Sequence, residues 1–371
     1  MGKHLLLLGG GHAHMTVMRD MQRFVQRGHR VSLVGPDVYH YYSGMGPGML
    51  GGTYAPEEIR FPVAEMVEAG GGTFIQDKAV SIDPQAGKVS LESGREVSYD
   101  VLSCNVGSGV PGSMLRDESR TVIPVKPIAN LVEARQRLQA ESLRTRLSIA
   151  VIGGGAASLE IAGNVWRAVR QGGGHMPHIR IYAGRSFLSG KPERVRKLAR
   201  ASLRQRSIEV HESGYVSEIR DGSISLESGV TGAADLIFLA VGVKPPSLFA
   251  DSNLPVGADG GLLVNSFLHS PDYPEIFGGG DCIYYQDQGL DKVGVYAVRQ
   301  NPVLAHNLLA ALEGGALQRF SPGKSYLLIY NLGNDQGLFW KGRLIFKGRI
   351  AFRIKDHIDR KFMRNFSPQR A

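Results

Sequence analysis

Two glycine-rich motifs, each at the end of an apolar run, constrain the fold of this 371-residue chain more than any other feature. The first reads LLLLGGGHAH over 5–14, and the second reads AVIGGGAASLE over 150–160. Each apolar run is typical of a buried strand, and the residues after each glycine turn are typical of a helix. A further strand follows each helix, so the sequence predicts two β-turn-α-β units.

The glycines of both motifs have a physical role in binding a dinucleotide. Gly9 permits a tight turn after the strand, and Gly11 lets the backbone approach a pyrophosphate without interference from a Cβ atom. The helix that follows presents free N–H groups and the positive end of its dipole to the phosphates. Gly153 and Gly155 repeat this spacing in the second unit.

The third glycine of the usual motif is replaced in both units, by His14 and by Ser158. This position governs how closely the helix packs on the strand, so a larger residue there spreads the packing without removing the phosphate site. One such altered motif is a weak signal. Two in one chain, both between a strand and a helix, favour dinucleotide binding over an ordinary glycine turn.

The rest of the chain alternates between expected strands and helices. The segment YYSGMGPGMLGGTY, 41–54, is too irregular for a regular element, and 324–348 reads as a hairpin. Helices are expected over 14–27, 130–142, 156–170, 296–312 and 351–366, and a β-meander is expected within 71–108.

Composition limits the class of protein and its surroundings. The 43% hydrophobic content suits a globular core, and the formal charge of +9 favours acidic partners such as anionic lipid or phosphorylated cofactors. No nucleic-acid module is recognisable, so nucleic acid is not expected as a partner. The two cysteines, Cys104 and Cys282, form neither a C-x-x-C pair nor a metal-ligand pattern, so no metal is expected. With no signal peptide or membrane-spanning run evident, we expect a cytoplasmic protein.

Further segments fit one known family. YDVLSCNVGS, DLIFLAVGVKP and IFGGGDC each end a strand in a small-residue turn. Together with the two glycine motifs they resemble flavoprotein reductases with two dinucleotide-binding domains, the pyridine nucleotide-disulfide oxidoreductase superfamily. GGGHAH, YYSGMGPGMLGG, VIPVKPI, YAVRQNPVLAHNL and KDHIDRKFM look most similar to type II NADH dehydrogenases and to the dehydrogenase-like domain fused to selenide, water dikinase.

The resemblance implies an α/β fold with two Rossmann-like domains, one for FAD and one for NADH or NADPH, plus a small C-terminal hairpin-helix region. The FAD domain is expected over 1–123 and 249–320, the NAD(P)H domain over 124–248, and the C-terminal region over 321–371. The residues implied for FAD are Gly9, Gly11, His12, Ala13, His14, Asp37, Ser43, Gly44, Ala79, Asn105, Gly107, Lys126, Asp281, Gly294, Val295 and Tyr296. Those implied for the nicotinamide nucleotide are Gly153, Gly155, Ala156, Ala157, Ser158, Arg185 and Gly242.

The resemblance also implies the reaction. Hydride passes from a nicotinamide to the flavin, and electrons then pass to an acceptor, with a quinone expected. Because neither cysteine matches the redox pair of the disulfide reductases, transfer without a disulfide is favoured. Glu160 is the candidate catalytic residue, since a glutamate of the type II enzymes at this point reaches toward the contact between flavin and nicotinamide. The alternative is a non-catalytic or partner-dependent flavoprotein, an electron-transfer or accessory component linked to selenium metabolism.

The sequence departs from the family where acids should bind the adenosine riboses. The first acid would fall at Gly35, and Asp37 is the candidate substitute. The second is missing from AGRS, 183–186. Arg185 there could meet a 2′-phosphate, which favours NADPH, or lie on the surface, and a second site that binds no nicotinamide also stays open.

The expected C-terminal helix has Ile354, Ile358, Phe362 and Phe366 at a spacing of four, with Met363 beside them and basic residues around the stripe. A basic amphipathic helix with aromatic residues can lie in a membrane interface, here the inner face of the cytoplasmic membrane. It can equally dock on the core of its own chain or on the partner in a homodimer. The resemblance to monotopic quinone reductases favours peripheral membrane contact.

Overall fold

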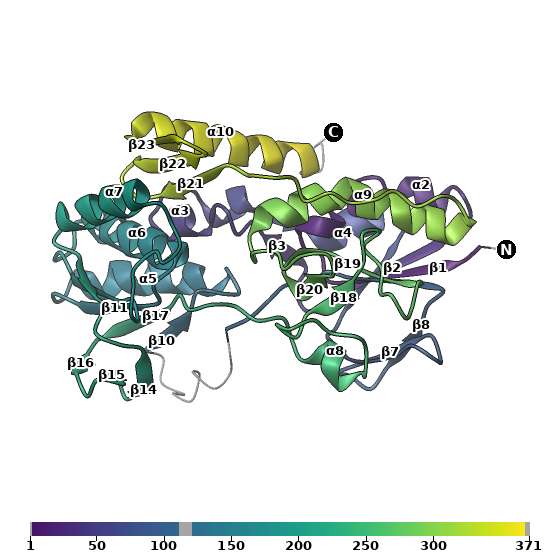
Figure 1. Cartoon of the computed structure of the whole chain (residues 1–371), viewed down its shortest axis with the longest axis horizontal. Coiled ribbons are helices and arrows are strands. Elements are labelled where there is room, and N and C mark those ends of the chain that lie inside the picture. The colour runs from purple at the N-terminus through teal and green to yellow at the C-terminus, as the bar shows by residue number, and fades with distance from the viewer. Residues whose placement is uncertain (1, 111–120, 368–371) are drawn as a thin grey trace.

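The computed structural model describes residues 2–110 and 121–367, and two parallel five-stranded sheets form its centre (Figure 1). The first sheet has the order β19-β9-β1-β2-β5, with β1 His4–Leu8, β2 Arg30–Gly35, β5 Thr73–Gln76, β9 Val101–Cys104 and β19 Ile276–Gly278. Leu5, Leu6, Leu7 and Leu8 are fully buried in its central strand. A parallel strand covered on both faces needs such an unbroken apolar run.

The second sheet has the order β10-β17-β11-β12-β13, with β10 Val122–Pro124, β11 Ser148–Ile152, β12 His178–Tyr182, β13 Glu209–His211 and β17 Leu236–Leu239. All of its pairings are parallel. β10 pairs with β17 and therefore belongs to the second sheet. This sheet thus begins at residue 122, two residues before the domain boundary that the sequence suggests at 124. The α/β fold with two Rossmann-like sheets is thus as the sequence predicts.

The helices after the two glycine turns differ. The second unit has one continuous helix, α6 Ala156–Gly172, which ends at the left-handed Gly173. In the first unit the single helix expected over 14–27 is wrong. A 3₁₀ turn, His12–His14, leads into α1 Met15–Arg19 and α2 Gln22–Val25, and Asp20 between them leaves helical geometry with φ −101° and ψ 21°.

The glycine-rich segment 41–54 is not the irregular loop that the sequence suggests. It contains the helix α3 Gly46–Leu50, which packs against α6 and against α5 Asn130–Ser142. A Cβ atom on Gly48 would lie 2.5 Å from the Tyr54 ring, and one on Gly51 would lie 2.4 Å from Asn164 Oδ1. Gly51 therefore permits close packing between the two halves of the molecule, whereas Gly48 permits close packing on Tyr54 within the first half.

Smaller elements complete the fold. They are β3 Tyr39–Tyr41, β4 Arg60–Pro62, α4 Val63–Ala69, β6 Ala79–Asp83, β7 Lys88–Leu91, β8 Glu96–Ser98, α7 Glu193–Arg204, β14 Val216–Arg220, β15 Ser223–Leu226, β16 Thr231–Ala233, α8 Leu248–Asp251, β18 Leu262–Val264, β20 Ile283–Tyr285 and α9 Gly294–Glu313. The 3₁₀ turns Pro56–Ile59 and Gly280–Cys282 lie between them.

The C-terminal region lies across both halves of the molecule (Figure 1). It is a three-stranded antiparallel sheet, β21 Leu328–Asn331, β22 Gly337–Lys341 and β23 Leu344–Gly348, where a hairpin was expected, followed by α10 Arg349–Phe366. The apolar stripe of α10 is divided. Phe362, Met363 and Phe366 are buried against the chain's own core, whereas Ile358 is exposed.

Candidate functional site

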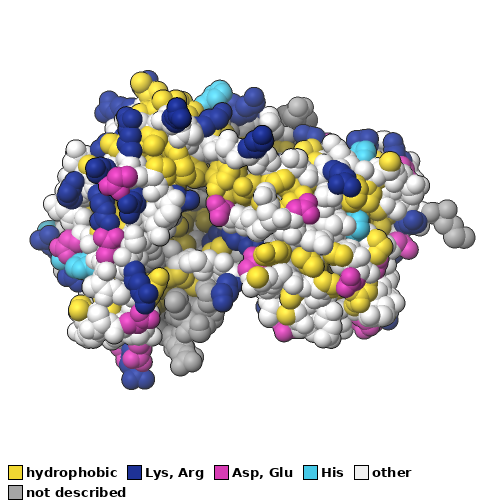
Figure 2. Space-filling model, viewed as in Figure 1, with side chains coloured by type: hydrophobic (Ala, Val, Ile, Leu, Met, Phe, Trp, Pro, Cys, Tyr) yellow, Lys and Arg dark blue, Asp and Glu magenta, His cyan; other side chains and the backbone are white. Residues whose placement is uncertain are grey.

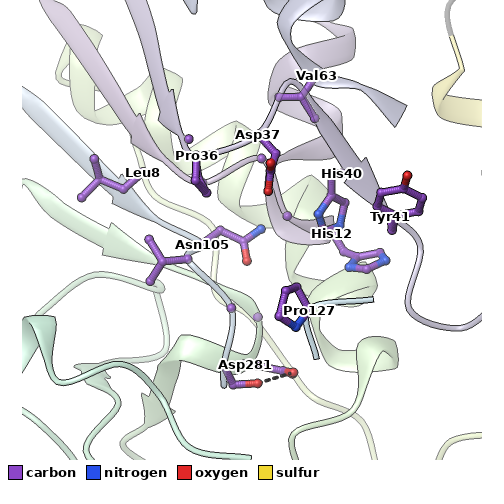
Figure 3. Close-up of a pocket in the computed structure, with 18 of the residues that line it drawn as sticks. Leu8, His12, Pro36, Asp37, His40, Tyr41, Val63, Asn105, Pro127 and Asp281 are labelled. Carbon is purple, nitrogen blue, oxygen red and sulfur yellow. Dashed lines mark hydrogen bonds between the residues drawn. The ribbon is translucent and has the colours of Figure 1, made fainter. Parts of the chain in front are cut away.

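A cavity of about 490 Å³ lies at the carboxyl ends of the strands of the first sheet. Its walls include the ends of β1 and β2 and the segments that follow β5 and β9. β1 is the central strand of this sheet. The next strand along the chain, β2, lies on one side of it, and the later strand β9 lies on the other side. Such a reversal of strand order is where open α/β sheets bind their ligands. Figure 3 shows side chains from these segments around the cavity.

The first glycine turn forms one wall of the cavity and leaves no room for side chains. Gly9 has φ +84°, and a Cβ atom there would lie 2.4 Å from the carbonyl oxygen of Asn105. A Cβ atom on Gly11 would lie 2.8 Å from the Asn105 side chain, whose buried Nδ2 has no hydrogen-bond partner within the described residues. The exposed backbone and the unpartnered amide fit the pyrophosphate of a dinucleotide.

Asp37 follows β2 by two residues and lines the cavity, as Gly35 does. In Figure 3 its carboxylate points inward between Pro36 and His40. A carboxylate at the end of the second strand is what a ribose hydroxyl pair requires. Asp37 is thus placed where it could take this role, which stays a prediction.

Asp281 lies at the other end of the cavity (Figure 3) and forms an ion pair with Lys126. The Lys126 Nζ donates to Asp281 Oδ2 at 2.7 Å, and the Ser108 hydroxyl donates to the same oxygen at 3.0 Å. Both charged side chains are mostly buried. A carboxylate that accepts two hydrogen bonds is held in one orientation, which suits recognition of a polyhydroxyl chain.

The cavity includes most but not all of the residues implied for FAD. Those that line it are Gly9, Gly11, His12, Asp37, Ser43, Ala79, Asn105, Gly107, Lys126, Asp281 and Gly294. Ala13, His14, Gly44, Val295 and Tyr296 lie outside its lining. Gly44 instead accepts a hydrogen bond from Lys355 through its carbonyl, and Tyr296 packs on the ring of Tyr326. Their proposed role stays a prediction.

His14 explains the altered third position of the first motif. Its side chain is fully buried, with Nδ1 2.7 Å from the Gly9 carbonyl oxygen and Nε2 2.8 Å from the Ser103 hydroxyl. Burial lowers the pKa of His14 to about 4. The imidazole is therefore neutral and joins the glycine turn to β9, a contact that a third glycine could not make.

Two further histidines lie together at the cavity wall. The His12 and His40 rings meet edge to face with centroids 4.9 Å apart, and both Nε2 atoms are buried without a hydrogen-bond partner in the described residues. Burial, with the nearby Lys126 charge, lowers the pKa of His12 to about 4 and that of His40 to about 3. Sequence reasoning missed His40, because nothing in its local pattern distinguishes it.

The second glycine turn has the same construction. Gly153 has φ +137°, and a Cβ atom there would lie 2.2 Å from the Ala240 carbonyl oxygen. Gly155 is exposed, with open space around its Cβ position, and caps the N-terminus of α6. Ser158 is fully buried one turn into the helix. The backbone N–H groups of Ala156 and Ala157 are thus at a free helix N-terminus beside an open glycine.

Two other residues implied for the nicotinamide nucleotide are exposed at the carboxyl edge of the second sheet. Arg185 follows β12 by three residues, and its guanidinium carbon lies 5.6 Å from the centroid of the Tyr215 ring. Gly242 follows β17, with open space around its Cβ position. Both lie on loops that extend from the strands flanking β11.

Glu160, the candidate catalytic residue, faces the C-terminal region, and its catalytic role stays a prediction. It is not among the cavity residues, and its Oε1 accepts the backbone N–H of Asn331, in β21, at 2.6 Å. Burial raises the pKa of Glu160 to about 7, although the charge of Lys355 opposes that shift. The carboxyl group thus faces the C-terminal region.

Cys104 and Cys282 are free and fully buried. Burial raises the pKa of Cys104 well above its usual range and that of Cys282 to about 11. Protonated, buried thiols are poor nucleophiles, which agrees with their interpretation as small apolar residues. Among the residues in the described ranges, no cluster of three or more histidine, cysteine or carboxylate side chains could hold a metal ion.

Two nucleotide-binding sheets, with a cavity at the first and an open glycine turn at the second, define an oxidoreductase with two dinucleotide-binding domains. The chain belongs to the pyridine nucleotide-disulphide oxidoreductase family, whose model matches residues 3–308. Membership of this family implies FAD and NAD(P)H as cofactors.

Individual relatives are distant but cover most of the chain. Ferroptosis suppressor protein 1 of Taeniopygia guttata is 26% identical over 74% of this chain and 74% of its own length. The type II NADH:quinone oxidoreductase of Staphylococcus aureus is 23% identical over 86% of this chain and 85% of its own. Among solved structures, NDH2 from Plasmodium falciparum in complex with NADH has a TM-score of 0.81 at 14% identity, covering 99% of this chain and 97% of that one.

Proposed function

We propose that this protein is a FAD-dependent NAD(P)H dehydrogenase that passes electrons to a quinone without a redox disulfide. The observation that carries the proposal is the cavity that joins the first glycine turn to Asp37 at one end and to the Asp281–Lys126 pair at the other. Relatives named as quinone oxidoreductases support the acceptor. When bound, FAD supplies a carrier that accepts a hydride and releases electrons.

Residues that line the cavity of the first sheet would bind and orient FAD. The backbone of Gly9 and Gly11 admits a pyrophosphate, and Asp37 accepts hydrogen bonds from the adenosine ribose. Asp281, oriented by Lys126 and Ser108, accepts from the polyhydroxyl chain that follows. Gly294, at the N-terminus of α9, lines the cavity. The positive end of the α9 dipole would stabilise negative charge on the flavin ring system.

The first test is the colour and reducibility of the protein. The purified chain is expected to be yellow and to lose its 450 nm band, as flavins do, when NADH or NADPH is added without oxygen. A preparation loaded with flavin that neither nucleotide bleaches would refute the dehydrogenase assignment. It would favour the alternative, a non-catalytic or partner-dependent flavoprotein, which predicts no saturable reduction in a stopped-flow experiment.

The surface of the C-terminal region supports peripheral contact with a membrane that holds the quinone. Leu344, Ile350 and Ile358 are exposed there, and Arg349 and Arg353 lie beside them. Figure 2 shows apolar and basic side chains together along this edge of the molecule. No helix in the described ranges is long and apolar enough to cross a bilayer. An apolar surface rimmed by cations suits anionic lipid headgroups.

Removing the exposed apolar side chains is expected to release the protein from lipid. The double substitution Ile350→Glu and Ile358→Glu should reduce co-sedimentation with vesicles containing anionic lipid at least about tenfold. Each isoleucine side chain that enters the lipid contributes about 1.5–3 kcal/mol to the free energy of binding. The matched control is Val80→Glu with Val230→Glu, which changes two exposed apolar residues outside the region. Equal sedimentation of both variants would contradict a docking role for this surface.

A further inference from the structure

The two halves of the molecule differ in the charge that they place beside the expected adenosine ribose. In the first sheet, β2 is followed after two residues by the acid Asp37. In the second sheet, β12 is followed after three residues by the cation Arg185, and the segment 183–186 contains no acid. An acid at this place selects a free ribose 2′-hydroxyl, whereas an arginine accommodates a 2′-phosphate.

The fold places Arg185 beside the second glycine turn. The Leu188 N–H donates to the Gly154 carbonyl oxygen at 2.7 Å. A Cβ atom on Gly154 would lie 2.5 Å from the Ala183 carbonyl oxygen and 3.0 Å from that of Ser186. The loop that contains Arg185 is therefore packed directly against the turn that would admit a pyrophosphate.

Arg185 is free to meet a ligand. Its side chain is exposed, and within the described part of the chain it forms no ion pair. The guanidinium group lies over the face of the Tyr215 ring, and Tyr215 is itself 53% exposed. The ring also packs on Gly184, where a Cβ atom would lie 2.7 Å from it. Tyr215 thus positions the guanidinium group at the surface of the loop without neutralising it.

The carboxylate at the end of the neighbouring strand is already engaged. Glu212 follows β13, and Arg200 donates to both of its oxygens at 2.7 Å. The same carboxylate accepts the Phe187 backbone N–H at 2.6 Å. With these partners Glu212 is unsuited to accept hydrogen bonds from a ribose hydroxyl pair, so this edge of the sheet is cationic toward a ligand.

From this arrangement we infer that Arg185 binds the 2′-phosphate of NADPH and makes NADPH the preferred electron donor. The inference rests on the proposed function, since it concerns the nicotinamide site of the dehydrogenase. A guanidinium group can donate two hydrogen bonds to a phosphate, which NADH lacks. With NADH the arginine gains no partner, and the ribose 2′-hydroxyl finds no carboxylate.

Binding of nucleotide fragments tests the inference without any redox reaction. Titration calorimetry on the flavin-loaded protein should show adenosine 2′,5′-bisphosphate binding at least about tenfold more tightly than adenosine 5′-monophosphate. Arg185→Ala should remove this difference and leave binding of the monophosphate unchanged. The matched control is Arg220→Ala, which removes an exposed cation at the far end of β14, about 16 Å along the strand from Tyr215. It should keep the wild-type difference.

Kinetics separate this inference from the proposed function. NADPH should have a kcat/KM for flavin reduction at least about tenfold above that of NADH, and Arg185→Ala should lose the preference mainly through KM for NADPH. If NADH is preferred and the wild-type protein binds the two fragments equally, the inference is wrong and the dehydrogenase function stands. If neither nucleotide reduces the flavin, the proposed function is wrong, and fragment binding alone then decides whether Arg185 recognises a 2′-phosphate.

Discussion

The substitution Gly155→Val is expected to lower the rate of flavin reduction by nicotinamide nucleotide at least about 100-fold, while the purified protein stays yellow. Gly155 has an extended backbone, φ −92° and ψ −173°, which valine adopts readily, and among the described residues no atom beyond its chain neighbours lies within 4 Å of its Cβ position. The new side chain would therefore fit the protein but occupy the space into which a pyrophosphate must come. Loss of those phosphate contacts corresponds to about 3 kcal/mol or more.

The corresponding change in the first motif should have the opposite pattern. Gly11→Val places its side chain against Asn105, 2.8 Å from the Cβ position, and toward the cavity. The protein is expected to purify without flavin, as measured by the ratio of absorbance at 450 nm to that at 280 nm. Gly315→Val is the control, since Gly315 lies beyond α9 with only ordinary contacts to Ala310. If Gly155→Val is reduced as fast as the wild-type protein, the second turn does not bind the donor.

Acid is expected to destabilise the protein strongly below pH 6.5, because three histidines with buried ring nitrogens are neutral in the fold. The pKa is lowered to about 4 for His12 and His14 and to about 3 for His40, against 6.5 in an unfolded chain. As the pH falls, the unfolded chain takes up these protons first, so stability present above pH 6.5 is lost toward pH 4. Each uncompensated proton costs about 1.4 kcal/mol per pH unit.

Two buried acids act in the opposite direction over part of this range. Burial raises the pKa of Glu160 to about 7 and also raises that of Asp359, so the folded state binds those protons first. Three histidines against two acids still leave a net loss of stability as the pH falls toward 4.5, with a slope that approaches about 1.4 kcal/mol per pH unit. Urea-unfolding midpoints at pH 7, 6 and 5, followed by circular dichroism, measure this slope.

One variant isolates the contribution of a single histidine. His40→Phe keeps a ring of similar size, and His40 Nε2 has no hydrogen-bond partner in the described structure that the change would remove. The slope should become shallower by about 1.4 kcal/mol per pH unit. His306→Gln, at an exposed position of α9, should not alter it. If stability falls with pH equally steeply in His40→Phe and in the wild-type protein, the pKa of His40 is not lowered in the fold.

The strands around both glycine turns could be predicted from the sequence because their signal is local. Buried parallel strands need unbroken apolar runs, and Leu5–Leu8 and 148–152 supply them directly before glycine. The helix over 130–142 was predicted with the bounds that the structure has, since its pattern is also local. The family resemblance suggested Asp37 and Asp281 as site residues, and both line the cavity, each just beyond a strand of the first sheet.

The contacts that the sequence did not reveal join segments far apart in the chain. His14 bonds to Ser103 in β9, and Glu160 bonds to Asn331 in β21, so neither partner could be inferred from the pattern around the other. The same holds for the buried part of α10. Its stripe of Phe362 and Phe366 fits a membrane or a protein core equally well, and only tertiary packing distinguishes them.

The packing of α3 has a consequence for the timing of the reaction. Gly51 lets this helix pack against Asn164 of the second half of the molecule. Arg167 of α6 donates to the Gly51 carbonyl oxygen at 3.0 Å and to Asp335 of the C-terminal region at 2.8 Å. The two halves are thus joined before any nucleotide arrives. We therefore expect the distance between the nicotinamide and the flavin to be fixed when the chain folds. Each turnover then needs no relative movement of the two halves, only the entry and release of the nicotinamide nucleotide.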